Sequence, residues 1–244
     1  MASPLRAKAR SSHASTTKAQ ALDIGEQRIY HVTHVSNLPG ILNSGCLLAD
    51  SSDAWVTRPA VDISSPDNRE SRRTTLVAGV DGFSVASYVP FFLSPDATVW
   101  NNIRSGTPDR RLSSEARGAA ASDFVVLVST VGRAGVGRTS DAHSAHADIA
   151  VTDGDAVGIL SRCEVTGGTR ERMLRKLRAD EDSAAILSAE FLVALSFAFE
   201  SVSLIGVANT RARDVVKAAL EASAFAPKVS VYPPWFQPAE VTEP

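Results

Sequence analysis

Cysteine is almost absent from this chain of 244 residues, which contains only Cys46 and Cys163. Two isolated cysteines exclude a disulfide framework and a cysteine-ligated metal site, and they favour a reducing, cytosolic compartment. Long hydrophobic runs are lacking as well, and no uninterrupted apolar segment reaches the length that spans a bilayer. We therefore expect a cytoplasmic protein with no membrane partner.

An excess of positive charge is also missing, because 25 lysines and arginines are balanced by 27 acidic residues and the formal net charge is -2. This balance excludes an overall basic surface, although a local basic groove for nucleic acid stays possible. Hydrophobic residues make up 44% of the sequence and charged residues 21%, which is typical of a globular protein. A chain of this length can bury the core of one large domain without disulfides.

Acidic residues are absent before Asp23, and the first positions are rich in Ala, Ser, Thr, Lys and Arg without an apolar period. The segment also lacks the apolar centre of a secretory signal. We predict a disordered arm over residues 1–25 and a folded domain over residues 26–244. A basic arm could contact nucleic acid, but the composition favours a solvated tail.

The common nucleotide and hydrolase motifs are missing too, since the chain has no Gly-x-Gly-x-x-Gly, P-loop or Gly-x-Ser-x-Gly segment. His143 and His146 have one of the spacings that zinc sites use, but no third strong ligand stands at a diagnostic distance. We therefore predict a polar loop there and no metal site.

Secondary structure is indicated by apolar patterning. Apolar, β-branched and aromatic segments predict strands at residues 28–32, 84–93, 123–130, 201–208 and 229–232. Helical spacing predicts helices at residues 38–43, 169–178 and 210–223, and residues 190–199 fit a buried strand or a short helix. Residues 50–80 and 132–147 look like long loops, and residues 104–118 fit a surface loop or a frayed helix. Many strands with few long helices indicate an α+β fold.

Glu190 stands immediately before the most apolar run of the chain. A carboxylate buried there must be paired or hydrogen bonded, so a catalytic role and a structural role are equally compatible with its position. His31 lies in a predicted strand, where the residues alone favour a satisfied core histidine over a ligand-binding one.

Four segments, in this order, together resemble the DarT family of DNA ADP-ribosyltransferase toxins. They are Tyr30-His31-Val32-Thr33-His34 with the following Asn37-Leu38, the aromatic Tyr88-Val89-Pro90-Phe91-Phe92-Leu93, the turn Thr152-Asp153-Gly154, and Ala189-Glu190-Phe191-Leu192-Val193. Where the family commonly has Pro-Arg-Ser-Pro-Met-Leu, this chain has Pro95-Asp96-Ala97-Thr98-Val99-Trp100. That departure leaves the preferred base open.

The resemblance implies an α+β, ADP-ribosyltransferase-like fold with a split antiparallel sheet and flanking helices. It also implies NAD as co-substrate and transfer of ADP-ribose to a thymine or guanine base of single-stranded DNA. Catalysis would fall to Glu190 and Arg72, with Arg69 and Arg73 as competitors for the arginine's role. NAD binding would involve the residues matching the family's first two segments and its arginine, namely His31, Thr33, Asn37, Leu38, Arg72 and Tyr88.

The residue types suit this chemistry. A carboxylate stabilises the oxocarbenium-like charge that develops as nicotinamide leaves NAD, and it can accept the proton of the attacking base. An arginine can hold a diphosphate with two parallel hydrogen bonds. Contacts to DNA are predicted for arginines after Trp100 and before Glu190, namely Arg104, Arg170, Arg172 and Arg175, with Arg110, Arg111 and Arg178 as further candidates. Arginines at helical spacing are equally compatible with a solvated face.

The family also implies a toxin of a bacterial toxin–antitoxin or phage-defence pair, with a macrodomain antitoxin as partner, and we expect a monomer. Two alternatives stay open. The same fold could modify RNA or protein, or the chain could be a silent module that binds NAD or nucleic acid without turnover.

Overall fold

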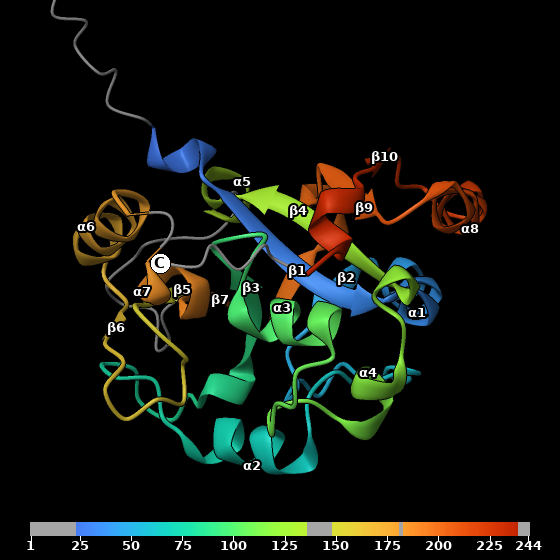
Figure 1. Cartoon of the computed structure of the whole chain (residues 1–244). Coiled ribbons are helices and arrows are strands. Elements are labelled where there is room, and N and C mark those ends of the chain that lie inside the picture. Colours follow the sequence, from blue (N-terminus) through green and yellow to red (C-terminus); the bar gives the residue numbers. More distant parts are fainter. Residues whose placement is uncertain (1–22, 136–147, 181–182, 239–244) are drawn as a thin grey trace, which may run out of the picture.

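A large β-sheet runs through the molecule (Figure 1). The computed structural model describes residues 23–135, 148–180 and 183–238. The strands of this sheet are β10 (Lys228–Val231), β9 (Leu204–Val207), β4 (Phe124–Thr130), β1 (Arg28–His34), β3 (Tyr88–Phe92), β7 (Glu190–Ala194), β5 (Ile149–Thr152) and β6 (Cys163–Glu164), in this spatial order. All neighbours are antiparallel except β10 and β9, which are parallel. A second small sheet pairs β2 (Cys46–Leu48) with β8 (Ser196–Ala198).

The large sheet is split between β1 and β3, which pair only at Tyr30 and Phe92. Pro90 explains why the ladder stops. The carbonyl oxygen of Pro90 points toward β1, where the Nδ1 atom of His31 lies 2.9 Å away. The N–H of a strand residue faces the same neighbour as its carbonyl group, and proline has no N–H to donate. The backbone ladder is therefore open at this point, as the expected split sheet requires.

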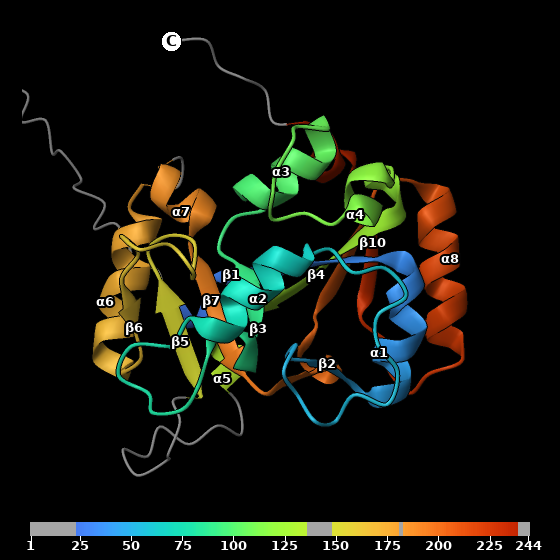
Figure 2. The same cartoon turned by 90° about the horizontal axis from the view of Figure 1, so that it is seen from below.

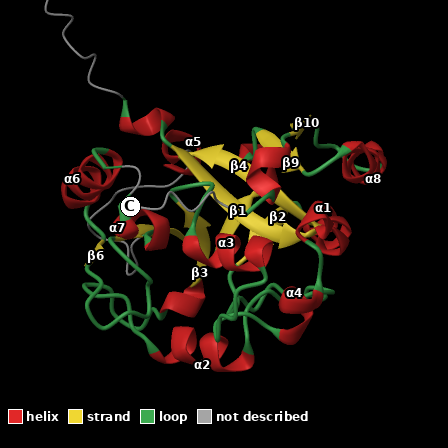
Figure 3. Ribbon diagram, in the orientation of Figure 1, coloured by secondary structure: helices red, strands yellow, loops and turns green. Residues whose placement is uncertain are grey.

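Helices surround the sheet on several sides (Figures 1 and 3). They are α1 (Leu38–Ser44), α2 (Pro66–Thr74), α3 (Thr98–Ser105), α4 (Ser114–Gly118), α5 (Val131–Gly135), α6 (Gly167–Arg178), α7 (Ala184–Ser188) and α8 (Thr210–Glu221), with 3-10 turns η1 (Ile24–Glu26), η2 (Val35–Asn37), η3 (Val85–Ser87), η4 (Ala121–Asp123), η5 (Phe199–Ser201) and η6 (Pro233–Phe236). Seen from below, α2 lies between the α6–α7 pair and the α1–α8 pair (Figure 2). None of the helices that the structure describes is both long and apolar enough to cross a membrane.

Both faces of the sheet are covered, and strand β4 shows how. Val125 and Leu127 pack into the larger apolar core, whereas Phe124, Val126 and Val128 pack on the opposite face with Trp100 of α3. Successive strand residues point to opposite faces, so a strand that is apolar at every position can be buried on both sides. This explains the uninterrupted apolar run in residues 124–128.

The predicted α+β fold with a split antiparallel sheet is confirmed, and residues 190–199 prove to form strands, β7 and β8, followed by the start of η5. Several elements were not predicted, namely β2, α4, α5, β5, β6 and α7 as well as the two helices that matter most for the site. Helix α2 lies inside the predicted long loop and buries none of its residues, so it carries no apolar period. Helix α3 begins before the predicted loop at residues 104–118. At the N-terminus, Ile24 is buried, so the last residues of the predicted arm already belong to the fold.

Candidate active site

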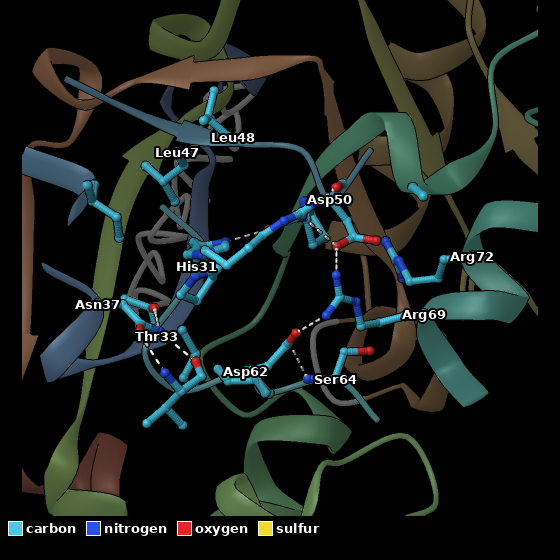
Figure 4. Close-up of a pocket in the computed structure, with 18 of the residues that line it drawn as sticks. His31, Thr33, Asn37, Leu47, Leu48, Asp50, Asp62, Ser64, Arg69 and Arg72 are labelled. Atoms are coloured by element: carbon cyan, nitrogen blue, oxygen red, sulfur yellow. Dashed lines mark hydrogen bonds and ion pairs between the residues drawn. The ribbon is translucent and has the colours of Figure 1, made fainter. Parts of the chain in front are cut away.

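A cavity of about 550 Å³ opens where β1 and β3 diverge. Predicted site residues from distant parts of the chain line it together, namely His31, Thr33, Asn37, Arg69, Arg72, Tyr88 and Glu190. Figure 4 shows His31, Thr33 and Asn37 on one side of this pocket and Arg69 and Arg72 on the other. Leu38 is fully buried in the apolar core and is not among the lining residues, so the structure supports it as a packing residue.

Glu190 is the first residue of β7, and only 5% of its surface is exposed. Arg72 of α2 forms a bidentate pair with its carboxylate, with distances of 3.1 Å from Nη1 to Oε1 and 2.9 Å from Nη2 to Oε2. The backbone N–H of Ala156 also donates to Oε1, at 3.1 Å. A buried carboxylate with these three hydrogen bonds is satisfied and held in one orientation.

The turn Thr152-Asp153-Gly154 fixes the backbone at Glu190. The hydroxyl of Thr152 accepts a hydrogen bond from the backbone N–H of Glu190 at 3.0 Å and donates to the carbonyl of Gly154 at 2.6 Å. Two of the four segments that carry the family resemblance are therefore in direct contact, although 38 positions separate them in the sequence.

Helix α2 delivers three arginines to three different environments. Arg72 reaches Glu190, whereas Arg69 forms ion pairs with Asp50 and Asp62, and Arg73 pairs with Asp50 at 3.0 Å. The structure thus singles out Arg72 as the arginine that touches the carboxylate. Burial by itself lowers the pKa of Arg72, but the charges of Glu190, Asp155 and Asp50 outweigh burial and raise that pKa. Arg72 is therefore a permanent cation.

His31 is half-buried on β1, with its Nδ1 directed at the carbonyl oxygen of Pro90. A carbonyl only accepts, so Nδ1 carries the proton and Nε2 of the neutral ring is an acceptor. Burial lowers the pKa of His31, and the hydrogen bond to Pro90 offsets only part of this effect. The ring therefore stays neutral and can accept a hydrogen bond from a hydroxyl group in the pocket.

Asn37 connects the strand to the long segment that closes the pocket. Its side-chain nitrogen donates to the hydroxyl of Thr33 at 3.1 Å and to the carbonyl of Val61 at 2.8 Å, and its oxygen accepts from the N–H of Val61 at 3.0 Å. Asn37 thus shapes the pocket wall. Tyr88 is buried in the wall, and burial raises the pKa of its hydroxyl to about 12.

Several pocket residues carried no sequence signal. Asp50 pairs with Arg58, Arg69 and Arg73, and Arg111 pairs with Asp155 at 2.9 Å across the pocket. These residues lie in segments without apolar periodicity, so nothing in the sequence marked which charges would meet. Within the described parts of the chain, no group of three His, Cys, Asp or Glu side chains could hold a metal ion; His143 and His146 lie outside those parts.

Of the predicted DNA contacts, Arg111 lines the pocket, whereas Arg104, Arg110, Arg170, Arg172, Arg175 and Arg178 do not. The side chain of Arg104 has no exposed surface and donates to Asp96 and to the carbonyl of Trp235, so it is a structural residue and its prediction as a DNA contact is wrong. Arg170 anchors α6 to β5 through the carbonyl of Ile149 at 2.8 Å. Arg172 and Arg175 are exposed on α6 and do not line the cavity.

Comparisons with known proteins point to one family. The family model described as "ssDNA thymidine ADP-ribosyltransferase, DarT" matches residues 30–237. A DNA ADP-ribosyl transferase of Thermus sp. (strain 2.9) is 35% identical over 81 residues, which is 33% of this chain and 37% of that protein. One from Mycobacterium tuberculosis is 38% identical over 69 residues, 27% of this chain and 28% of that protein. The chain thus matches only 37% and 28% of the lengths of these two curated relatives.

Solved structures share the fold. Thermus sp. 2.9 DarT in complex with ADP-ribosylated ssDNA superimposes with a TM-score of 0.68 at 23% identity, covering 86% of this chain and 96% of that one. Thermosipho africanus DarTG in complex with ADP-ribose gives a TM-score of 0.59 at 17% identity, covering 86% of this chain and 51% of that one. Because the family model spans the sheet, the pocket and the Arg72–Glu190 pair, the chain belongs to the DarT family.

Proposed function

We propose that this protein is a mono-ADP-ribosyltransferase that uses NAD and modifies a base of single-stranded DNA. The observation that carries the proposal is the buried Glu190, held by Arg72 at the wall of a cavity of about 550 Å³. A carboxylate paired with a permanent cation inside a pocket suits a reaction whose transition state is positively charged. The family model's description names the same activity.

NAD fits the groups that line the pocket. Carboxylates engage only the two Nη atoms of Arg69 and of Arg72, one hydrogen bond each, so each guanidinium keeps further N–H donors for a diphosphate. The Nε2 atom of His31 is free to accept a ribose hydroxyl, because Nδ1 is committed to Pro90. A second structure of Thermus sp. 2.9 DarT, in complex with NAD+, has a TM-score of 0.65 to this chain at 23% identity. We therefore infer that NAD occupies this cavity as a co-substrate.

The reaction can be balanced with the residues present. The bond between C1 of the ribose and the nicotinamide nitrogen breaks, and its electron pair leaves with neutral nicotinamide. The carboxylate of Glu190 stabilises the positive charge left on the ribose. A nitrogen of the base then bonds to C1, and its proton passes to Glu190. Arg72 holds the diphosphate or orients the acceptor strand.

The acceptor is best assigned to single-stranded DNA, because a base inside a duplex cannot reach an enclosed site. The family model's description names thymidine, which favours thymine over guanine as the modified base. Arg172 and Arg175, exposed on α6, stay as predicted contacts for the strand.

Biologically, we propose a toxin that a macrodomain antitoxin counteracts and that acts as a monomer. The support is the similarity to the DarTG chain, of which this chain covers only 51%. That leaves about half of the DarTG chain without a counterpart among the matched residues.

The direct test is turnover and NAD binding of Glu190→Ala beside the unmodified protein. With NAD and a mixed-sequence single-stranded oligonucleotide, the unmodified protein should release nicotinamide in proportion to modified DNA. Glu190→Ala should release no nicotinamide. Its affinity for NAD should stay within about threefold of that of the unmodified protein, because the carboxylate that it lacks acts mainly in the transition state. If the unmodified protein bound NAD without turnover, the result would support a silent module that binds NAD. If it modified RNA or protein and not DNA, the result would support the same fold acting on a different acceptor.

A further inference from the structure

Arg111 lies between α3 and α4, and carboxylates occupy two edges of its guanidinium. Its Nε donates to Asp109 at 3.0 Å and its Nη2 donates to Asp109 at 2.7 Å, while Nη1 donates to Asp155 at 2.9 Å. Only 24% of the Arg111 side chain is exposed. A guanidinium whose donors are engaged in this way has little capacity left for a DNA phosphate. Its position suggests a different task.

The backbone at Arg111 holds the start of helix α2. The N–H of Ser65 donates to the carbonyl of Arg111 at 2.8 Å, and the Ser65 hydroxyl donates to the carbonyl of Arg110 at 2.8 Å. The same hydroxyl accepts from the N–H of Asn68 at 3.2 Å and so caps α2. Because α2 carries Arg72, the segment around Arg111 sets where Arg72 meets Glu190.

The side chain of Arg111 holds the other partner of Glu190. Asp155 accepts from Arg111 through Oδ2 and from the N–H of Val157 through Oδ1, at 3.1 Å. The residue between Asp155 and Val157 is Ala156, whose N–H donates to Oε1 of Glu190 at 3.1 Å. Both bonds of Asp155 therefore fix the turn that aims this N–H at the carboxylate.

We propose that Arg111 and Asp155 form a positioning pair for Glu190, one that locks the Ala156 N–H and the start of α2 around the same carboxylate. The inference rests on the proposed function and adds two residues that act through Glu190 without touching the reacting atoms. If the contact between the two side chains is lost, the Ala156 turn is released. Helix α2 and its arginines stay in place, because the start of α2 is bonded to the backbone carbonyls of Arg110 and Arg111, which the variants keep. The step that depends on Glu190 should slow, and NAD affinity should change little.

The kinetic test compares Arg111→Ala, Asp155→Ala and the double variant. We expect each single variant to lower kcat for DNA modification at least about tenfold, with KM for NAD and for the oligonucleotide changing less than about threefold. The double variant should be no slower than the slower single variant, because both changes break one contact. Asp155→Asn, which keeps an oxygen for Val157, should lie between the unmodified protein and Asp155→Ala.

Arg162→Gln is the matched control. Arg162 is exposed and lies between β5 and β6, as Asp155 does, and the substitution removes one positive charge, as Arg111→Ala does. It should keep kcat and both KM values. Multiplicative losses in the double variant would overturn the proposal, because they would indicate separate roles. A raised KM for the oligonucleotide with unchanged kcat in Arg111→Ala would also overturn it and make Arg111 a direct DNA contact.

A measurement without DNA separates this inference from the proposed function. In protein labelled with ¹⁵N-alanine, the amide proton of Ala156 should move upfield in Asp155→Ala and in Glu190→Ala but not in Arg162→Gln, because the hydrogen bond to the carboxylate is lost. An Ala156 signal that Asp155→Ala leaves unmoved would contradict the positioning pair. If the unmodified protein failed to modify DNA while the signal moved as expected, only the proposed function would fail.

Discussion

Glu190 and Arg72 are buried together, and a buried ion pair tolerates the loss of one partner far less than the loss of both. Arg72→Ala leaves Glu190 with the Ala156 N–H alone, in a residue that is 5% exposed. We expect Arg72→Ala to lower the free energy of unfolding by about 3 kcal/mol. The double variant Arg72→Ala/Glu190→Ala should recover much of that loss in urea denaturation. A double variant as unstable as Arg72→Ala would contradict the pairing.

His31 gives a prediction for pH dependence at the same scale. Burial lowers its pKa, so the neutral ring is the native form. Its contribution to stability is complete above the ordinary pKa of about 6.5 and is lost as the pH falls through the lowered value. In an NMR titration, the His31 ring should have its midpoint below 6.5. A midpoint at or above 6.5 would contradict the conclusion that burial outweighs the hydrogen bond to Pro90.

The matched variant His31→Gln tests the link between that titration and folding. It removes the ionisable ring from β1 while leaving a polar side chain of moderate size at the same position. Because a glutamine does not titrate, the part of the pH dependence below pH 6.5 that belongs to His31 should disappear from the free energy of unfolding. An unchanged pH dependence would assign the effect to other groups.

Among the elements, the segment between β2 and α2 is held in part by the side chain of Asn37. Asn37 makes two hydrogen bonds with the backbone of Val61. Asn37→Ala leaves these backbone groups without their partner, which should cost about 1–3 kcal/mol. We expect faster proteolysis within residues 50–65 and a higher KM for NAD. Asn43→Ala, at an exposed position of α1, is the control for stability and should change it little.

The C-terminal turn η6 is fastened to the sheet by close packing. A Cβ atom on Gly206 of β9 would lie 2.7 Å from a ring carbon of Trp235. The carbonyl of Trp235 in turn accepts from Trp100 and Arg104 of α3. Gly206→Ala should therefore displace η6 and lower stability by about 1–3 kcal/mol.

Tryptophan fluorescence and thermal unfolding would measure the effect of Gly206→Ala. Gly118→Ala is the matched control, because a Cβ there meets nothing within 4 Å and Gly118 ends helix α4. It should leave stability unchanged or raise it slightly. Equal effects of the two variants would argue against tight packing at Trp235.

The same elements show what the sequence could reveal. Glu190 stands out because it begins an apolar run, and His31 because it lies within an apolar strand. The strand of His31 was predicted correctly, whereas the residues after Glu190 were left open between a strand and a short helix. Helix α2 was missed because its sequence is polar on every face and its stability comes from the Ser65 cap and Pro66. The contact between Arg111 and Asp155 joins positions 44 residues apart in two irregular segments, so no local pattern could predict it.

For the whole molecule, the split sheet explains how the site is assembled. One half of the sheet supplies His31 and Thr33 from β1, and the other supplies Tyr88 from β3 and Glu190 from β7. The halves separate beside Pro90, and the pocket fills the opening between them. The architecture therefore predicts one site for both substrates of the transfer, NAD and a base.

The most direct measurement is mass spectrometry of single-stranded oligonucleotides, each with only one kind of candidate acceptor base, after incubation with NAD and the purified protein. The account predicts one ADP-ribose adduct on the thymine-containing oligonucleotide and none with Glu190→Ala. An adduct on guanine alone would revise the base and leave the chemistry intact. The absence of any adduct on every DNA oligonucleotide would contradict the central claim that this pocket transfers ADP-ribose to DNA.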